Sequence, residues 1–226
     1  MNVCVSILSK TIDESLKKIR TAEEYGADLI EIRIDGFEIY DDLSRIEKST
    51  DIPLIATNRP AKEGGFFKED EKKRIEILIE AAKEGFEYID IELSTKNVAE
   101  IANIIRSFGS KVIISFHDFN RTPSTDEIQE IFEKELNKEA DVCKLVTTAK
   151  RFDDNLRLFN FIYENAKRTK VVCFAMGEIG KVSRLVSPIL GAFFTIASLD
   201  KGEETAHGQL GIVEMRELYE RLGLSF

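Results

Sequence analysis

The sequence has few of the residues that mark disulfide-rich, fibrous or membrane proteins. Its 226 residues include four prolines, three cysteines and no tryptophan. Cys4, Cys143 and Cys173 are odd in number, lie in apolar runs and form no C-x-x-C pair, so we expect buried free thiols in a reducing compartment. The apolar runs are too short to span a bilayer, and the run 3–8 lacks the basic flank of a secretion signal. These features predict a cytoplasmic protein without a membrane partner.

An excess of positive charge is also lacking. The chain has 32 lysines and arginines against 41 acidic residues, a net charge of -9, and no sustained basic block. We therefore expect no nucleic-acid partner, and an anionic ligand would need arginines placed close to it. His117 and His207 are the two histidines. Asp118 follows His117 on a predicted strand and points to the other face, so the two cannot easily share a metal ion, and we expect no metal site.

Short apolar, β-branched runs alternate with longer amphipathic stretches along the whole chain. The runs recur roughly every 25 to 30 residues, which is the size of a strand followed by a helix. Eight strands are expected, at 3–8, 29–34, 53–57, 88–93, 112–117, 142–147, 171–176 and 192–197.

The stretches between these runs carry helix start and stop signals. Thr11 with Glu14 forms a capping box, and Gly26 ends the helix that follows. Further helices are expected over 67–84, from Ser94 or Thr95 to Phe108, from Ser124 or Thr125, from Asp153 or Asp154, and over about 209–222. No linker interrupts the series. It predicts one (β/α)₈ barrel domain spanning residues 1–226, with an open doubly wound sheet as the alternative.

One face of the predicted strands is repeatedly polar. Parallel strands usually read as continuous apolar runs, yet alternate positions here hold Ser6, Glu31, Arg33, Thr57, Arg59, Asp90, Glu92, Ser115, His117 and Lys144. Buried charges are costly unless they pair, and in barrels they converge at the carboxyl ends of the strands, where active sites lie. The pattern favours a catalytic site there; structural salt bridges are the alternative.

Lys144 shares one face of its strand with Val142 and Val146, so its surroundings are dry. Such a lysine must pair with a carboxylate or lose its proton and become a nucleophile. With a ketone it would form a protonated Schiff base, and a histidine of near-neutral pKa, such as His117, could then move protons on the substrate. We expect imine chemistry on an oxygen-rich anion. A structural lysine and a hydrogen-bonded structural histidine are the alternatives.

Six segments resemble, in order, the motifs of type I 3-dehydroquinate dehydratase. They are 31–35, 57–65, 115–119, 144–146, 176–184 and 205–209, which together span nearly the whole chain. The resemblance implies a (β/α)₈ barrel, usually a homodimer, that dehydrates 3-dehydroquinate to 3-dehydroshikimate in the shikimate pathway of aromatic amino acid biosynthesis. It implies a lyase without metal or organic cofactor.

The resemblance also implies roles for individual residues. Lys144 matches the Schiff-base lysine, His117 the proton-transfer histidine and Glu63 the residue that orients this histidine. A larger set matches substrate-binding positions: Ser6, Glu31, Arg33 and Arg59 at the hydroxyls, Arg184 and Gln209 at the carboxylate, Thr205 in the last motif, and Met176 against the ring. The last motif has His207 where the family commonly has proline, and we expect it to be a surface histidine.

Two other functions remain open from the sequence. A class I aldolase would also use a Schiff-base lysine in a barrel, but its substrates carry phosphate, and Arg184 with Gln209 suits a carboxylate better. A barrel that only binds a ligand would be expected to lack Lys144 or His117, and both are present.

Overall fold

The computed structural model describes residues 1–40 and 42–224. Its parallel strands pair in the order β7-β6-β5-β4-β3-β2-β1-β8, so neighbours follow the chain and the last strand returns to the first. The strands are β1 (Val3–Leu8), β2 (Leu29–Arg33), β3 (Leu54–Thr57), β4 (Tyr88–Glu92), β5 (Lys111–His117), β6 (Val142–Thr148), β7 (Lys170–Met176) and β8 (Thr195–Ala197). The Phe193 N–H, two residues before β8, donates to the Val171 carbonyl of β7 at 2.7 Å. The predicted barrel is confirmed, and the doubly wound alternative is wrong.

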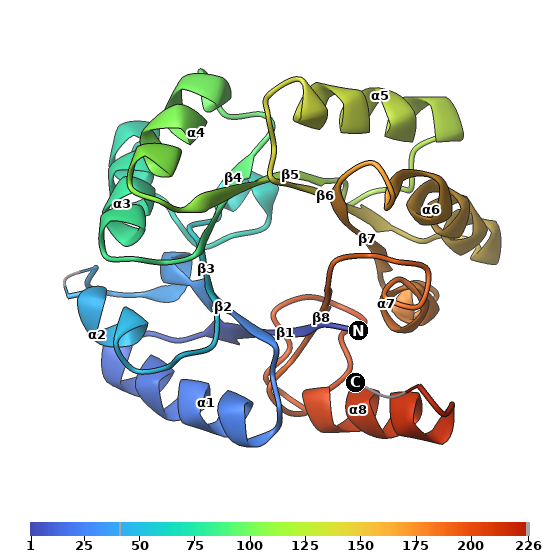
Figure 1. The fold of residues 1–226 in the computed structure, drawn as a ribbon, viewed down its shortest axis with the longest axis horizontal. Coiled ribbons are helices and arrows are strands. Elements are labelled where there is room, and N and C mark those ends of the chain that lie inside the picture. The colour runs from blue at the N-terminus through green and yellow to red at the C-terminus, as the bar shows by residue number, and fades with distance from the viewer. Residues whose placement is uncertain (41, 225–226) are drawn as a thin grey trace.

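Helices surround the strands on the outside (Figure 1). Within the described residues they are α1 (Ile12–Glu24), α2 (Ser44–Glu47), α3 (Glu71–Lys83), α4 (Val98–Ser107), α5 (Thr125–Leu136), α6 (Phe152–Asn165), α7 (Lys181–Val186) and α8 (Ile212–Arg221), with 3₁₀ turns η1 (Ile34–Gly36) and η2 (Ala61–Glu63). The Thr11 side chain accepts from the Glu14 N–H, and Ser124 and Glu127 form a reciprocal capping box on α5. These caps explain why the two helices begin where the sequence predicts.

The barrel interior is layered along the strand direction. Its lower layer is an apolar cluster that includes Cys4, Leu29, Ile55, Tyr88, Ile113, Val142, Val172 and Phe194. Two residues further along the strands, the same face carries Ser6, Glu31, Thr57, Asp90, Ser115 and Lys144. Cys143 and Leu145, on the opposite face of β6, pack in the cluster under α5 and α6. The alternation thus directs the polar positions into the barrel, above an apolar floor.

The cysteines are free and buried, as expected. No helix in the described part of the chain is long and apolar enough to cross a membrane.

Candidate active site

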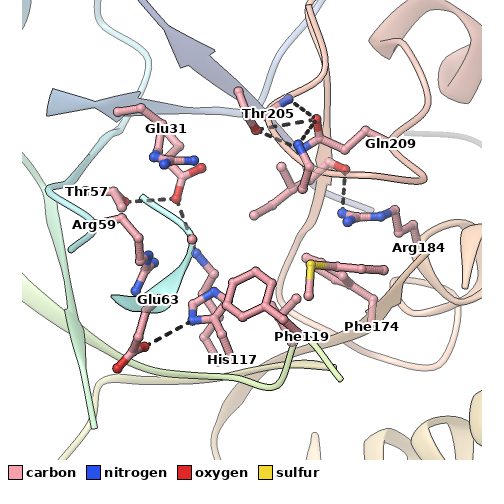
Figure 2. A pocket seen from close by; sticks show the side chains of 17 residues that line it. Glu31, Thr57, Arg59, Glu63, His117, Phe119, Phe174, Arg184, Thr205 and Gln209 are labelled. Carbon is pink, nitrogen blue, oxygen red and sulfur yellow. Dashed lines mark hydrogen bonds and ion pairs between the residues drawn. The ribbon is translucent and has the colours of Figure 1, made fainter. Parts of the chain in front are cut away.

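A cavity opens at the carboxyl ends of the strands (Figure 2). Of the eleven predicted site residues, ten line it: Glu31, Arg33, Arg59, Glu63, His117, Lys144, Met176, Arg184, Thr205 and Gln209. Ser6 is the exception, because it lies behind Glu31 and Thr205 and bonds to both. Residues that are more than 170 positions apart in the chain therefore meet in one cavity, since every strand of a barrel delivers its end to the same face.

Lys144 is an ion-paired lysine in this structure. Its Nζ donates to Asp90 Oδ2 at 2.7 Å and to Glu31 Oε1 at 3.2 Å, and its side chain is 3% exposed. Burial lowers the pKa of Lys144, but the charges of Asp90 and Glu31 outweigh this effect and raise it above its ordinary value. Of the two states open from the sequence, the ligand-free site holds the paired ammonium.

The carboxylates around Lys144 are held by further hydrogen bonds. Glu31 accepts from Ser6 Oγ at 2.5 Å and from Thr57 Oγ1 at 2.9 Å. Burial raises its pKa, but Lys144 and then Arg33 bring the pKa down to about 2, so Glu31 stays charged. Asp90 was among the polar strand residues, but its contact with Lys144 could not be predicted. The register of the strands determines which side chains lie at the same depth in the barrel, and the sequence does not give this register.

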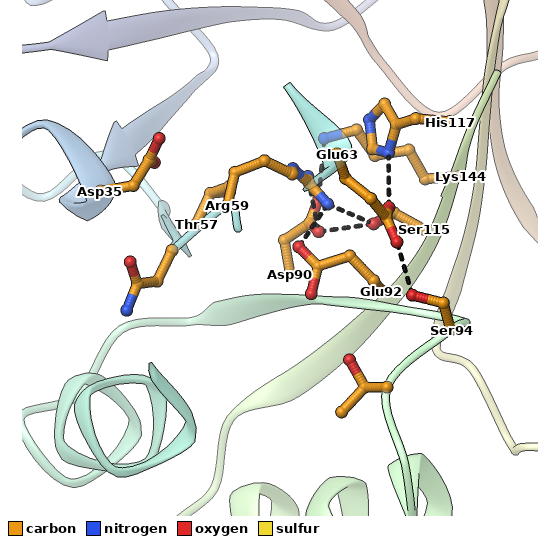
Figure 3. A network of polar contacts seen from close by, with 12 residues as sticks. Asp35, Thr57, Arg59, Glu63, Asp90, Glu92, Ser94, Ser115, His117 and Lys144 are labelled. Carbon is orange, nitrogen blue, oxygen red and sulfur yellow. Dashed lines mark hydrogen bonds and ion pairs between the residues drawn. The ribbon is translucent and has the colours of Figure 1, made fainter. Parts of the chain in front are cut away.

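Arg59 joins two strands beneath the cavity (Figure 3). Its Nη1 donates to Glu92 Oε1 at 2.7 Å and its Nη2 to Asp90 Oδ1 at 2.9 Å. Ser115 Oγ accepts from Arg59 and donates to Asp90. Each buried charge here has an opposite partner, which offsets the cost of removing it from water.

His117 stands beside Glu63 at the rim of β5. Its Nδ1 lies 3.9 Å from Glu63 Oε2, and Ser94 Oγ donates to Glu63 Oε1 at 2.5 Å. Phe119 stacks on the imidazole with the ring centroids 6.1 Å apart. Burial, and secondly the Arg59 charge, lowers the pKa of His117 to about 4. The near-neutral pKa expected from the sequence is wrong for the ligand-free site, because the imidazole is dry and faces cations.

Arg33 is fixed by a carboxylate of its own. Its Nε and Nη2 donate to the two oxygens of Asp35 at 2.8 and 2.7 Å. Asp35 Oδ2 also accepts from the Phe66 N–H at 3.0 Å, which ties the loop after η2 to this arginine. The bidentate pair orients the Arg33 guanidinium at the cavity wall.

Arg184 differs from the other cavity arginines, because it has no carboxylate partner within the described residues. It is 1% exposed, its Nε and Nη2 have no hydrogen-bond partner there, and Nη1 reaches the Ile196 carbonyl at 3.5 Å. The guanidinium stacks on Phe174 at 4.3 Å. Burial lowers the pKa of Arg184 to about 9. A buried cation with free donors that faces a cavity is suited to bind an anion.

The last motif forms a compact hydrogen-bonded loop at the cavity rim. Gln209 Oε1 accepts from the Thr205 N–H at 2.7 Å, and its Nε2 donates to Thr205 Oγ1 at 3.0 Å. Thr205 Oγ1 donates to Ser6 Oγ at 3.1 Å. His207 is exposed, as expected, and its carbonyl accepts from the Gly177 N–H at 3.2 Å. Its ring does not line the cavity.

Several lining residues were not predicted as site residues. Thr57, Gly64, Phe119, Val146, Phe174, Ile196 and Ala206 complete the wall. Thr57 carried a signal, since it occupies a polar strand position. The apolar members carry none, because an apolar residue at a strand end looks the same in sequence whether it faces a cavity or a helix.

No group of three or more possible metal ligands occurs in the described part of the chain. The cavity carboxylate Glu31 and the buried Asp90 are each engaged by Lys144, and the cavity carboxylate Glu63 is engaged by Ser94.

Comparison with known proteins decides the family. The model of the type I 3-dehydroquinase family matches residues 3–225. The chain belongs to the type I 3-dehydroquinase family. Relatives of this chain include the 3-dehydroquinate dehydratases of Dehalococcoides mccartyi, 37% identical over 219 residues (96% of this chain, 94% of the relative), and Methanococcus maripaludis, 34% identical over 222 residues (96% and 98%).

A solved relative of this chain is the type I 3-dehydroquinate dehydratase of Clostridium difficile, whose structure contains covalently modified comenic acid. It has a TM-score of 0.88 and 27% identity and covers 100% of this chain and 93% of its own. The match extends over the whole barrel, so the family assignment applies to every strand that contributes to the cavity.

Proposed function

We propose that the protein dehydrates 3-dehydroquinate to 3-dehydroshikimate through an imine on Lys144. The observation that carries this proposal is the buried, anion-free guanidinium of Arg184 in the same cavity as Lys144 and His117. A substrate with a carboxylate at one end and a ketone across its ring engages both cations. The names of the relatives support the same activity.

Imine formation is balanced without an outside proton donor. The Lys144 ammonium passes one proton to a neighbouring base, and the neutral amine attacks the ketone carbon. The base then returns this proton to the carbinolamine hydroxyl, which leaves as water. Overall, ammonium and ketone give a protonated imine and one water, and the positive charge is retained. Asp90 and Glu31 hold Nζ from two sides, so the positive charge stays compensated throughout.

His117 then acts as base and as acid in turn. With a pKa of about 4 the imidazole is neutral at pH 7 and can accept the proton from the carbon next to the iminium. The electrons flow into the iminium and form an enamine. The imidazolium returns its proton to the β-hydroxyl, which leaves as water, and hydrolysis of the conjugated iminium releases the enone and restores Lys144. Glu63, which accepts a hydrogen bond from Ser94 and lies 3.9 Å from His117 Nδ1, would orient the imidazole.

The remaining predicted residues would bind the substrate. Glu31, Arg33 and Arg59 present charged groups to its hydroxyls, Gln209 and Thr205 assist Arg184 at the carboxylate, and Met176 packs against the ring. Ser6 would act indirectly, by orienting Glu31 and Thr205. The aldolase alternative is less well supported, because a single arginine and an amide match one carboxylate better than a phosphate.

Reductive trapping tests the proposal. Borohydride with 3-dehydroquinate should add the mass of one reduced ligand to the protein, and Lys144→Ala should abolish the adduct and the ultraviolet absorbance of the enone product. Lys181 is the matched control, because it lies outside the cavity and pairs with Glu178 at 2.8 Å. An adduct that persists in Lys144→Ala and disappears in Lys181→Ala would refute the assignment.

We also propose that the protein works as a homodimer in the cytoplasm. One face of α6 exposes Phe152, Leu156 and Tyr163, with exposed fractions of 57%, 48% and 64%, and such a face is suited to a partner subunit. Light scattering at micromolar concentration should give twice the chain mass, and the mass of a single chain would contradict the dimer.

A further inference from the structure

A buried arginine outside the cavity, Arg74 on α3, holds the ends of two strands together. It is 1% exposed, and its Nη1 lies 2.6 Å from Glu92 Oε2 and donates to the Asn58 carbonyl at 3.0 Å. Its Nη2 donates to Thr95 Oγ1 at 3.0 Å. Glu71, which is partly exposed, binds it from the outer side in a bidentate pair. Arg74 therefore contacts the residue after β3, the last residue of β4 and the loop after β4 at once.

The first branch from Arg74 leads to the nucleophile. Glu92 Oε2 faces Arg74, and its other oxygen accepts from Arg59. Arg59 in turn donates to Asp90 Oδ1, which leaves Asp90 Oδ2 for Lys144 (Figure 3). Arg74, Glu92, Arg59, Asp90 and Lys144 alternate in charge along this chain. An arginine at its outer end keeps each carboxylate between two cations.

The second branch leads to the acid/base pair. Thr95, which accepts from Arg74, directly follows Ser94, which donates to Glu63. Glu63 lies 3.9 Å from the His117 imidazole. A shift of the Thr95 backbone would therefore move the Ser94 hydroxyl and loosen Glu63. Both functional groups of the cavity depend on the same helix side chain.

We propose that Arg74 is a positioning residue for catalysis, which holds the Glu92 carboxyl group and the 94–95 turn in place so that Lys144 and Glu63 keep their geometry. This proposal rests on the imine mechanism proposed above. Arg74 does not line the cavity, so its effect on the reaction passes through the groups that it binds beside the cavity: Glu92, Thr95 and the Asn58 carbonyl. Lost positioning of this kind lowers turnover by about tenfold to a hundredfold, with a smaller effect on substrate binding.

The ionisation of Glu92 supports this role. The groups that face it are Arg59 from the end of β3, Arg74 from α3 and Asp90 from β4. Burial raises the pKa of Glu92 above its ordinary value, and the charges of Arg59 and Arg74 offset only part of this rise. Without Arg74, Glu92 would hold its proton up to a higher pH. Arg59 would then lose one of its two carboxylates, and the acid limb of the pH dependence of kcat would move to higher pH.

The test compares Arg74→Met, Arg74→Lys and Arg74→Gln with the wild type and with Arg157→Met. Arg157 is the control. It binds the Thr122 and Pro123 carbonyls before α5 and the Asp154 carboxylate on α6, its side chain is 30% exposed, and these partners lie outside the chain of charges. We expect Arg74→Met to lower kcat at least tenfold with KM changed less than threefold, and to shift the acid limb upward. Arg74→Lys should recover most of kcat, and Arg157→Met should stay within twofold of the wild type.

A double variant separates positioning from folding. In Arg74→Met with Glu92→Gln, no carboxyl remains to be protonated, so the upward shift of the acid limb should disappear. If Arg74→Met does not fold, Arg74→Gln provides the same comparison. The proposal would be overturned if the pH profile were unshifted in both Arg74→Met and Arg74→Gln. It would also be overturned if Arg157→Met lost as much kcat as Arg74→Met. Failure of the wild type to form the borohydride adduct would instead overturn the imine mechanism on which it rests.

Discussion

Arg184 and Arg59 line the same cavity, yet their removal should change stability in opposite directions. Arg184 is buried and has no carboxylate partner in the described part of the chain, and burial lowers its pKa from 12.5 to about 9. At about 1.4 kcal/mol for each pKa unit, burial of this charge costs about 5 kcal/mol. Its stacking on Phe174 and its bond to the Ile196 carbonyl return part of that free energy. We expect Arg184→Met to raise the free energy of unfolding of the ligand-free protein by about 1 to 3 kcal/mol.

Arg59→Met removes an arginine of similar burial that binds Asp90, Glu92 and Ser115. It leaves two buried carboxylates short of a partner, so the free energy of unfolding should fall by about 3 to 5 kcal/mol. Bound substrate should reverse the sign of the stability change in Arg184→Met, because the substrate carboxylate would pair with the Arg184 guanidinium. Loss of charge-assisted hydrogen bonds of about 1.5 to 3 kcal/mol in total should raise KM at least tenfold in Arg184→Met.

Urea denaturation of both variants, without and with substrate, and steady-state kinetics measure these effects. Arg184→Lys is the control that keeps a cation but loses the planar fork, so its KM should stay raised. A ligand-free Arg184→Met that is destabilised as strongly as Arg59→Met would refute the reasoning from the unpaired charge. An unchanged KM would refute the assignment of Arg184 to the carboxylate.

Other predictions concern the two histidines and two glutamates. His117→Ala should lower kcat by about 10² to 10⁴ or more, because one imidazole serves two proton transfers. His207 is exposed, so His207→Ala should lower kcat less than tenfold, and single-turnover assays compare the two variants. Because His117 must be neutral, kcat/KM should fall as pH drops through about 4, and Glu63→Gln should move this limb lower by removing a charge that raises the His117 pKa. Burial raises the pKa of Glu135 well above 4.5, so the protonated side chain stabilises the fold and this stabilisation is lost as pH rises. In urea unfolding, the gain in the free energy of unfolding of Glu135→Gln over wild type should therefore be larger at pH 9 than at pH 5.

The order and type of the strands could be predicted because each strand carries its own alternation. The predicted helix boundaries were wrong where a residue near the end of a helix makes a long-range contact instead. The helix expected from residue 67 begins at Glu71, because Phe67 pairs with Pro60 and packs on Tyr40 while Asp70 caps the helix. Local patterns cannot report such long-range contacts.

Two other helix starts were wrong for a reason that bears on function. Ser94 and Thr95 were expected to cap α4, which instead begins at Val98, and their hydroxyls bind Glu63 and Arg74. Gln209 was expected within α8, which begins at Ile212, and its amide instead holds the Thr205 turn. In each case a side chain that could have capped or extended a helix instead forms a hydrogen bond at or near the cavity. The resemblance named the lining residues, but the pairing of Lys144 with Asp90 required the register of the barrel.

The closure of the barrel by its first and last strands also determines how the chain can fold. β8 pairs with β1 over three residues, and the bond between Ser6 and Thr205 joins positions 199 apart in sequence. During synthesis the edge of β1 that pairs with β8 therefore stays unpaired until almost the whole chain has left the ribosome. Contacts of such sequence separation form late and slowly, so the cavity should be completed in the last folding step. The partly folded chain would pass through a stage in which an exposed parallel edge is open to aggregation.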